Sequence, residues 1–151
     1  MTAQILIRVT ADNIDVGPEL GRLEALGGGA VASFTGIVRG GNGLTAMELE
    51  HHPVMTHAAL TAIADEAMTR WPLAGVTIIH RYGRLLPGDR IVLTAAASSH
   101  RAASLEACAF LIDWLKTKAP FWKKEFFADG TGTWVDARDD DDEAAARWTK
   151  R

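Results

Sequence analysis

The feature that most constrains the fold is an apolar stripe along residues 101–118 that ends just before Pro120. Apolar side chains recur there at intervals of three and four residues, the pattern of a helix with one buried face; they are Leu105, Cys108, Ala109, Ile112 and Leu115. Pro120 ends the helix because its ring cannot continue the backbone hydrogen-bond ladder. A second stripe over residues 55–71 predicts another long helix, and both helices need a surface to pack on.

Short strand-like segments supply that surface. Seven are predicted, at residues 5–9, 30–38, 46–52, 76–82, 91–97, 121–127 and 133–137. Pro87-Gly88 favours a turn, so the fourth and fifth segments are expected to form a hairpin. Strands occur in adjacent pairs as well as alternating with helices. The sequence therefore predicts an α+β fold with a mostly antiparallel sheet, two long helices and one short helix.

Helix ends are predicted from capping residues. Asp15 is the expected cap of the short helix, which Gly27-Gly28-Gly29 ends. Ser98 and Ser99 are the expected caps of the helix over residues 101–118. The segment 143–148 is expected to add one or two helical turns.

Length and composition place the chain among ordinary globular domains. Its 151 residues predict one domain, residues 1–151, with the acidic segment of about 136–151 appended. A net charge of −3 disfavours nucleic acid as a partner. The single cysteine excludes an intrachain disulfide and suits a reducing compartment. With no signal-peptide pattern and no apolar run of about 20 residues, the chain is expected in the cytoplasm, away from membranes.

Positive charge is concentrated between His100 and Lys124, which suggests a small anionic ligand rather than a long polyanion. The run Ser98-Ser99-His100-Arg101 begins a helix, and either anion binding or simple capping explains it. Lys116 and Lys123 flank Pro120 beside aromatic residues. Loss of hydration lowers the pKa of a lysine, so both are candidates for a base or nucleophile.

Helix length gives a prediction about assembly. His100 and Lys116 lie 16 positions apart on one predicted helix, which separates them by about 24 Å at 1.5 Å per residue. One small ligand cannot easily contact both from the same chain. If both residues serve one site, a second copy must supply one of them, so we expect a symmetric homodimer with shared sites.

The histidines do not indicate a metal site. His51 and His52 are adjacent on a predicted strand and point to opposite faces. No acidic or cysteine ligand completes a set, so no metal is expected. His51 is a candidate for lining a ligand pocket, Arg138 is a second such candidate, and Cys108 is expected to be a buried structural thiol.

Several motifs together resemble a known family. They are Phe34-Thr35-Gly36-Ile37-Val38-Arg39, Leu49-Glu50-His51-His52-Pro53, His80-Arg81-Tyr82-Gly83 with Pro87-Gly88-Asp89, Ser99-His100-Arg101, and Leu115-Lys116-Thr117-Lys118-Ala119-Pro120-Phe121-Trp122-Lys123-Lys124-Glu125. On these motifs the chain resembles the large, catalytic subunits of molybdopterin synthase (MoaE type) over about residues 5–148. The resemblance implies the α/β-hammerhead type of α+β fold.

The resemblance also implies a reaction. Such subunits transfer sulfur to cyclic pyranopterin monophosphate, opening the cyclic phosphate and forming the dithiolene of molybdopterin, without a resident cofactor. The sulfur arrives as a thiocarboxylate on the C-terminal tail of a small ubiquitin-like subunit of the MoaD type. The assembly is a heterotetramer: a central homodimer of large subunits that share their sites, with one small subunit at each end.

By resemblance, nine residues fall on the family's substrate-binding positions: Ile37, Val38, Arg39, His100, Arg101, Lys116, Lys123, Lys124 and Glu125. Lys116 is the expected main catalytic residue, as nucleophile or general acid/base, and Lys123 the residue that steers the thiocarboxylate and stabilises an oxyanion. Arg39, His100 and Arg101 are expected to hold phosphate and pterin, the latter two from the neighbouring chain. The sequence departs from the family at Gly40-Gly41-Asn42-Gly43 and at Ile37, where a basic residue is common.

Two other function classes remain open from the sequence. One is a catalytically silent scaffold that binds the ubiquitin-like tail, although the presence of both Lys116 and Lys123 argues against it. The other is a phosphate-ligand binding module without sulfur chemistry. Product formation with the thiocarboxylated partner separates these classes from the enzyme.

Overall fold

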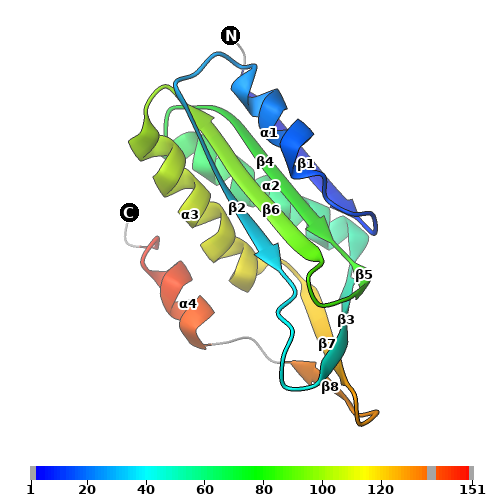
Figure 1. The fold of residues 1–151 in the computed structure, drawn as a ribbon. Coiled ribbons are helices and arrows are strands. Elements are labelled where there is room, and N and C mark those ends of the chain that lie inside the picture. The colour runs from blue at the N-terminus through cyan, green and yellow to red at the C-terminus, as the bar shows by residue number, and fades with distance from the viewer. Residues whose placement is uncertain (1–2, 136–138, 150–151) are drawn as a thin grey trace.

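The computed structural model describes residues 3–135 and 139–149, which form eight strands and four helices (Figure 1). In chain order these are β1 Gln4–Thr10, α1 Val16–Glu24, β2 Ala30–Ile37, β3 Leu44–His51, α2 Pro53–Arg70, β4 Leu73–Arg81, β5 Gly83–Leu85, β6 Arg90–Ser98, α3 Arg101–Lys118, β7 Phe121–Phe127, β8 Gly132–Val135 and α4 Asp139–Ala146. The predicted α+β class is confirmed, and β5 is a strand that the sequence did not indicate.

The larger sheet has the strand order β1-β4-β6-β2. Its pairs β4–β6 and β6–β2 are antiparallel, which confirms the predicted hairpin, and β1–β4 is parallel. Helices α2 and α3 cover one face of this sheet and α1 covers the other (Figure 1). Strand β6 is therefore buried on both sides, and small residues such as Ala95, Ala96 and Ala97 fit there between two packed layers.

A second sheet of order β5-β3-β7-β8 lies beyond the C-terminal end of α3 (Figure 1). Pro120 ends α3 and the chain continues directly into β7, so the end of the helix and the start of that strand stay together. A cluster of Val38, Met47, Leu49 and Leu85 is buried between the two sheets. The division into two sheets is a feature that the alternating sequence pattern did not predict.

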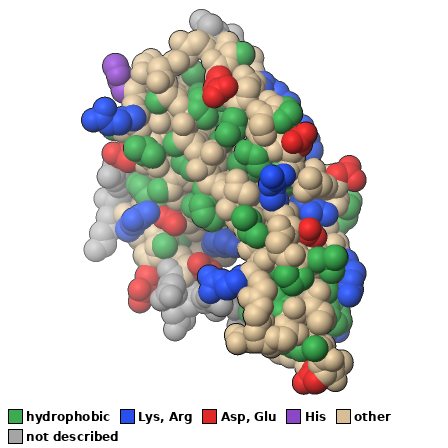
Figure 2. Space-filling view, in the orientation of Figure 1, with side chains coloured by type: hydrophobic (Ala, Val, Ile, Leu, Met, Phe, Trp, Pro, Cys, Tyr) green, Lys and Arg blue, Asp and Glu red, His purple; other side chains and the backbone are tan. Residues whose placement is uncertain are grey.

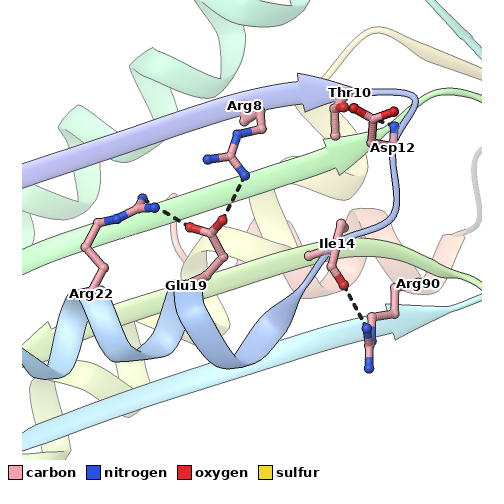
Figure 3. Close-up of polar contacts among 7 residues, drawn as sticks. All are labelled: Arg8, Thr10, Asp12, Ile14, Glu19, Arg22 and Arg90. Atoms are coloured by element: carbon pink, nitrogen blue, oxygen red, sulfur yellow. Dashed lines mark hydrogen bonds and ion pairs between the residues drawn. The ribbon is translucent and has the colours of Figure 1, made fainter.

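Polar contacts fix α1 to the larger sheet (Figure 3). The carboxylate of Glu19 is buried and accepts from Arg8 on β1 at 2.8 Å, and it pairs with Arg22 one turn along α1 at 3.1 Å. Arg90 Nη1 donates to the carbonyl of Ile14 at 2.7 Å, just before the helix. Asp15 is the N-cap residue as expected, although its side chain makes no capping hydrogen bond.

The start of α3 differs from the prediction. Its N-cap is His100, with no side-chain capping bond, so the capping roles of Ser98 and Ser99 were wrong. Ser98 is the last residue of β6, and its hydroxyl donates to the carbonyl of His100. Helix α2 begins at Pro53, and His52 accepts a hydrogen bond at Nδ1 from the Met55 N–H at 3.2 Å. His52 is thus a capping residue.

The described part of the acidic C-terminal segment packs on α3 (Figure 1). Trp148 is buried in the main core, and its indole N–H donates to Asp113 at 2.8 Å. Arg70 on α2 donates to the Trp148 carbonyl at 2.8 Å. The expected helical turns at 143–148 lie partly in α4. Among residues 3–135 and 139–149, no helix has the length and apolar content needed to cross a bilayer.

Candidate active site

A cleft lies where the end of α3 faces the second sheet. It consists of two adjoining hollows of about 170 and 410 Å³. Both hollows share five lining residues, so they form one continuous depression: Met47, Ile91, Lys116, Lys123 and Asp141. The apolar members come from strands, whereas the charged ones come from α3, β7 and α4.

The cleft brings Lys116 and Lys123 together, as the sequence predicted. Lys116 lies in the last turn of α3, and Lys123 lies on β7 after the bend at Pro120. Because side chains alternate along a strand, Lys123 and Glu125 share the cleft face of β7 with Phe121. Two cationic groups on a partly apolar wall suit a bound anion and a developing negative charge.

Lys124 lies on the opposite face of β7. Its ammonium group lies 5.3 Å from the ring centroid of Phe126 and 5.5 Å from that of Trp134. The cause is the same alternation that aims Lys123 and Glu125 inward. Within one protomer Lys124 is therefore not part of the cleft wall, and its predicted substrate contact is not made from this cleft.

The loop after β2 forms the far wall of the larger hollow, with Ile37, Arg39 and the glycine-rich turn. Val38, in contrast, is buried; its N–H donates to the Asp89 carbonyl and its carbonyl accepts from Gly88 N–H, both at 2.9 Å. Val38 thus holds the loop in place, while its neighbours Ile37 and Arg39 reach the hollow. Gly41, whose φ is +109°, needs a backbone conformation that favours glycine.

His100 and Arg101 lie at the other end of α3 and are exposed. The helix is continuous from Arg101 to Lys118, so about 24 Å separate His100 from Lys116. The structure of one protomer does not bring these residues to the cleft, so a site that uses both ends of α3 would need a second copy.

His51 is not a residue of the cleft wall. Its ring packs between Tyr82, with centroids 4.6 Å apart, and Phe121, with centroids 5.8 Å apart. It is the cross-strand partner of Phe121, and burial, followed by the charge of His52, lowers its pKa. Arg138, the other candidate pocket residue, lies outside the described residues.

Two titratable cleft residues had no role in the sequence prediction: His80 and Asp141. His80 is 4% exposed and stacks on Phe121, with ring centroids 3.8 Å apart. Burial lowers the pKa of His80 to about 3, and the charge of Lys116 adds to that effect. The available signal was a histidine directly after the mostly apolar segment Val76–Ile79. Asp141 was hidden in an acidic run that reads as a solvated segment.

Cys108 is buried, as predicted, on the sheet-facing side of α3. Burial raises the pKa of its thiol, and the sulfur lies 3.7 Å from the Thr94 hydroxyl. Such a thiol is a weak nucleophile. Within the described residues, no cluster of three or more histidine, cysteine or acidic side chains is arranged to hold a metal ion.

The visible molecular face carries lysine and arginine side chains interspersed with acidic ones (Figure 2). The charge that matters for a ligand is therefore local. Lys116, Lys123 and Arg39 provide three positive groups around the cleft against Glu125 and Asp141. This arrangement fits a compact anion more closely than an extended one.

Comparison with known proteins adds an independent finding. The sequence profile described as MoaE protein matches residues 9–118. The molybdopterin synthase catalytic subunit of Brucella melitensis is 47% identical over 151 residues, covering 97% of this chain and 93% of that protein.

Two solved structures share the fold. The molybdopterin biosynthesis MoaE protein of Burkholderia ambifaria is 50% identical, with a TM-score of 0.81 and 99% of each chain covered. A complex of subunits 1 and 2 of the molybdopterin-converting factor from Helicobacter pylori is 20% identical, with a TM-score of 0.70, covering 89% of this chain and 90% of that chain. The latter supports the fold alone.

Proposed function

The chain belongs to the MoaE protein family and functions as a molybdopterin synthase catalytic subunit, and we propose that Lys116 and Lys123 carry its sulfur-transfer chemistry. The observation that carries this assignment is that both ammonium groups line one cleft from different elements. The substrate is cyclic pyranopterin monophosphate, and the product is the dithiolene of molybdopterin. The reaction needs no resident cofactor or metal ion.

The cleft supports a division of labour between its two lysines. Lys116, at the junction of the two hollows, acts on the pterin carbon that receives sulfur, as nucleophile or general acid/base. Lys123 pairs with the incoming thiocarboxylate and stabilises the negative charge that develops on its oxygen. Arg39, on the loop wall of the larger hollow, holds the phosphate, and Ile37 and Glu125 complete that wall.

The sulfur donor is the C-terminal thiocarboxylate of a small ubiquitin-like subunit. The two hollows form one continuous depression, and the tail end and the pterin are expected to meet in it. A negatively charged tail end is attracted by the lysine pair. Cys108 is too deeply buried to carry sulfur between them.

The site is completed across a homodimer. His100 and Arg101 lie about 24 Å along α3 from Lys116, so the neighbouring chain supplies them to hold phosphate and pterin. Lys124, on the outer face of β7, is then available to a ligand only through a neighbouring subunit. Two large subunits and two small ones form the heterotetramer, and the assembly works in the cytoplasm.

A reconstitution experiment tests the proposal. The purified chain is mixed with thiocarboxylated small subunit and cyclic pyranopterin monophosphate, and the dithiolene product is detected. Product formation that depends on both additions is expected. Tail binding without product would instead indicate a silent scaffold, and ligand binding that ignores the partner would indicate a phosphate-binding module.

A further inference from the structure

His80 occupies a position that the reaction outlined above does not use. It ends the buried part of β4, and its side chain lines the smaller hollow together with Lys116 and Lys123. At 4% exposure it is a buried polar residue in the floor of a site whose other polar groups are charged. A polar group in such a place needs partners of matching chemistry.

Two contacts fix the ring of His80. One face lies on Phe121, with centroids 3.8 Å apart and an angle of 17° between the planes. Nδ1 lies 2.8 Å from the carbonyl oxygen of Arg81. A carbonyl can only accept, so Nδ1 carries the proton and Nε2 of the neutral ring keeps its lone pair.

The surroundings keep this ring neutral. A second proton would have to enter at Nε2, within a buried site beside the positive charge of Lys116. The charged and titratable groups around the ring come from four elements: Lys116 on α3, Lys123 on β7, Asp141 on α4 and His51 on β3. A neutral imidazole is thus an acceptor placed among ammonium groups.

We propose that His80 is a positioning residue of this site, whose unprotonated Nε2 accepts a hydrogen bond from the Lys116 ammonium group and orients it into the cleft. The idea rests on the proposed role of Lys116. The stack on Phe121 gives the arrangement its rigidity, because Phe121 follows directly after the bend that separates the two lysines. One side chain therefore sets the direction of Lys116 and supports the start of β7.

Two substitutions of His80 distinguish the effect of its hydrogen-bond acceptor from the effect of its aromatic ring. His80→Phe keeps an aromatic ring against Phe121 and removes both nitrogens, whereas His80→Gln keeps a donor and an acceptor on a smaller flat amide group. In the full dimer with its small subunit, we expect His80→Phe to lower kcat at least about tenfold with KM changed less than about twofold. His80→Gln is expected to recover part of kcat.

A second readout does not depend on turnover. A hydrogen bond to the charged form raises a pKa, so the pKa of Lys116, measured by NMR of isotopically labelled lysine, should fall by about one unit in His80→Phe. The limb of the kcat–pH profile that reports Lys116 should move equally. Asp141→Asn is the comparison variant, because Asp141 is an acidic residue that lines both hollows with Lys116.

The positioning role can also be tested with His80 in place, so the test does not depend on whether a His80 variant folds. Nitrogen NMR should show Nε2 of His80 unprotonated at pH 7, with a chemical shift that moves when Lys116 is replaced by Ala. A Lys116 pKa that is unchanged in His80→Phe, or an Nε2 shift that ignores Lys116→Ala, would overturn the positioning role. Turnover that survives Lys116→Ala would instead refute the proposed function, while the NMR coupling could still hold.

Discussion

The imidazole of His80 lies nearly flat on the ring of Phe121, 3.8 Å away, at the floor of a cleft walled by Lys116 and Lys123. This stack joins the last residues of β4 in the larger sheet to the first residue of β7 in the smaller one. The two sheets therefore meet at the cleft that holds the two lysines proposed to be catalytic. Stability at this junction and activity are expected to depend on some of the same residues.

Replacement of Lys116 by Ala should leave the protein folded and reduce dithiolene formation by at least about a hundredfold, because the group that acts on substrate is lost. The matched control is Lys118→Ala. Lys118 ends the same helix but lies 4.6 Å from the Trp114 ring centroid, and it does not line the cleft. The test measures the turnover of each variant with the thiocarboxylated partner, together with its melting temperature. Equal losses of turnover in the two variants would contradict a specific role of Lys116.

Mixed dimers should reveal a shared site. Lys116→Ala and Arg101→Ala homodimers are each expected to be inactive. After subunit exchange, half of the dimers pair one variant with the other, and one of their two sites has both residues intact. Activity should then recover to about a quarter of the wild-type value. If each site belongs to one chain, mixing will restore nothing.

His80 should make the protein acid-sensitive. Its pKa is about 3 in the folded protein, whereas an ordinary histidine has a pKa of 6.5, so between these pH values the unfolded chain binds a proton that the folded one excludes. The free energy of unfolding therefore rises with pH through this window and is fully regained above about pH 6.5. At pH 5 the contribution of His80 to the free energy of unfolding is about 2 kcal/mol smaller than at pH 7.

Urea unfolding of the wild type and His80→Phe at both pH values measures that contribution. The variant should lose less stability between pH 7 and pH 5 than the wild type does. An identical loss in the two proteins would assign the acid sensitivity to other groups.

Glu19 should stabilise the fold without affecting the reaction. Glu19→Ala removes the buried carboxylate that holds Arg8 and Arg22 (Figure 3). Because both arginines are partly exposed and can be hydrated, the expected loss is only about 1–2 kcal/mol in the free energy of unfolding. Turnover below the melting transition should match that of the wild type; Glu24→Ala, an exposed neighbour, serves as the control.

Cys108 should be dispensable for sulfur transfer. Cys108→Ala keeps a small apolar group on the buried face of α3 and should retain turnover within about twofold. The thiol of the folded wild type should also react slowly with a disulfide reagent, because burial raises its pKa. Loss of turnover in Cys108→Ala at unchanged melting temperature would mean that the thiol takes part in the reaction.

The sequence determined the two long helices and predicted that Lys116 and Lys123 lie in one candidate site. The stripe over residues 101–118 and Pro120 predicted α3 and its end, because helix periodicity and the missing proline N–H act locally. The same locality placed Lys116 and Lys123 on either side of one bend. Helix length alone also predicted that His100 could not reach the same pocket from one chain.

The tertiary structure decided everything that depends on which surfaces meet. No local pattern distinguishes one sheet from two, so β5 and the second sheet were not predicted. Strand alternation turned Lys124 away from Lys123 once the burial of β7 had fixed which face was inward. His80 fell within the predicted strand 76–82 without an assigned role. Only tertiary packing put its ring on Phe121 and in one hollow with Lys116, since such contacts join residues far apart in the chain.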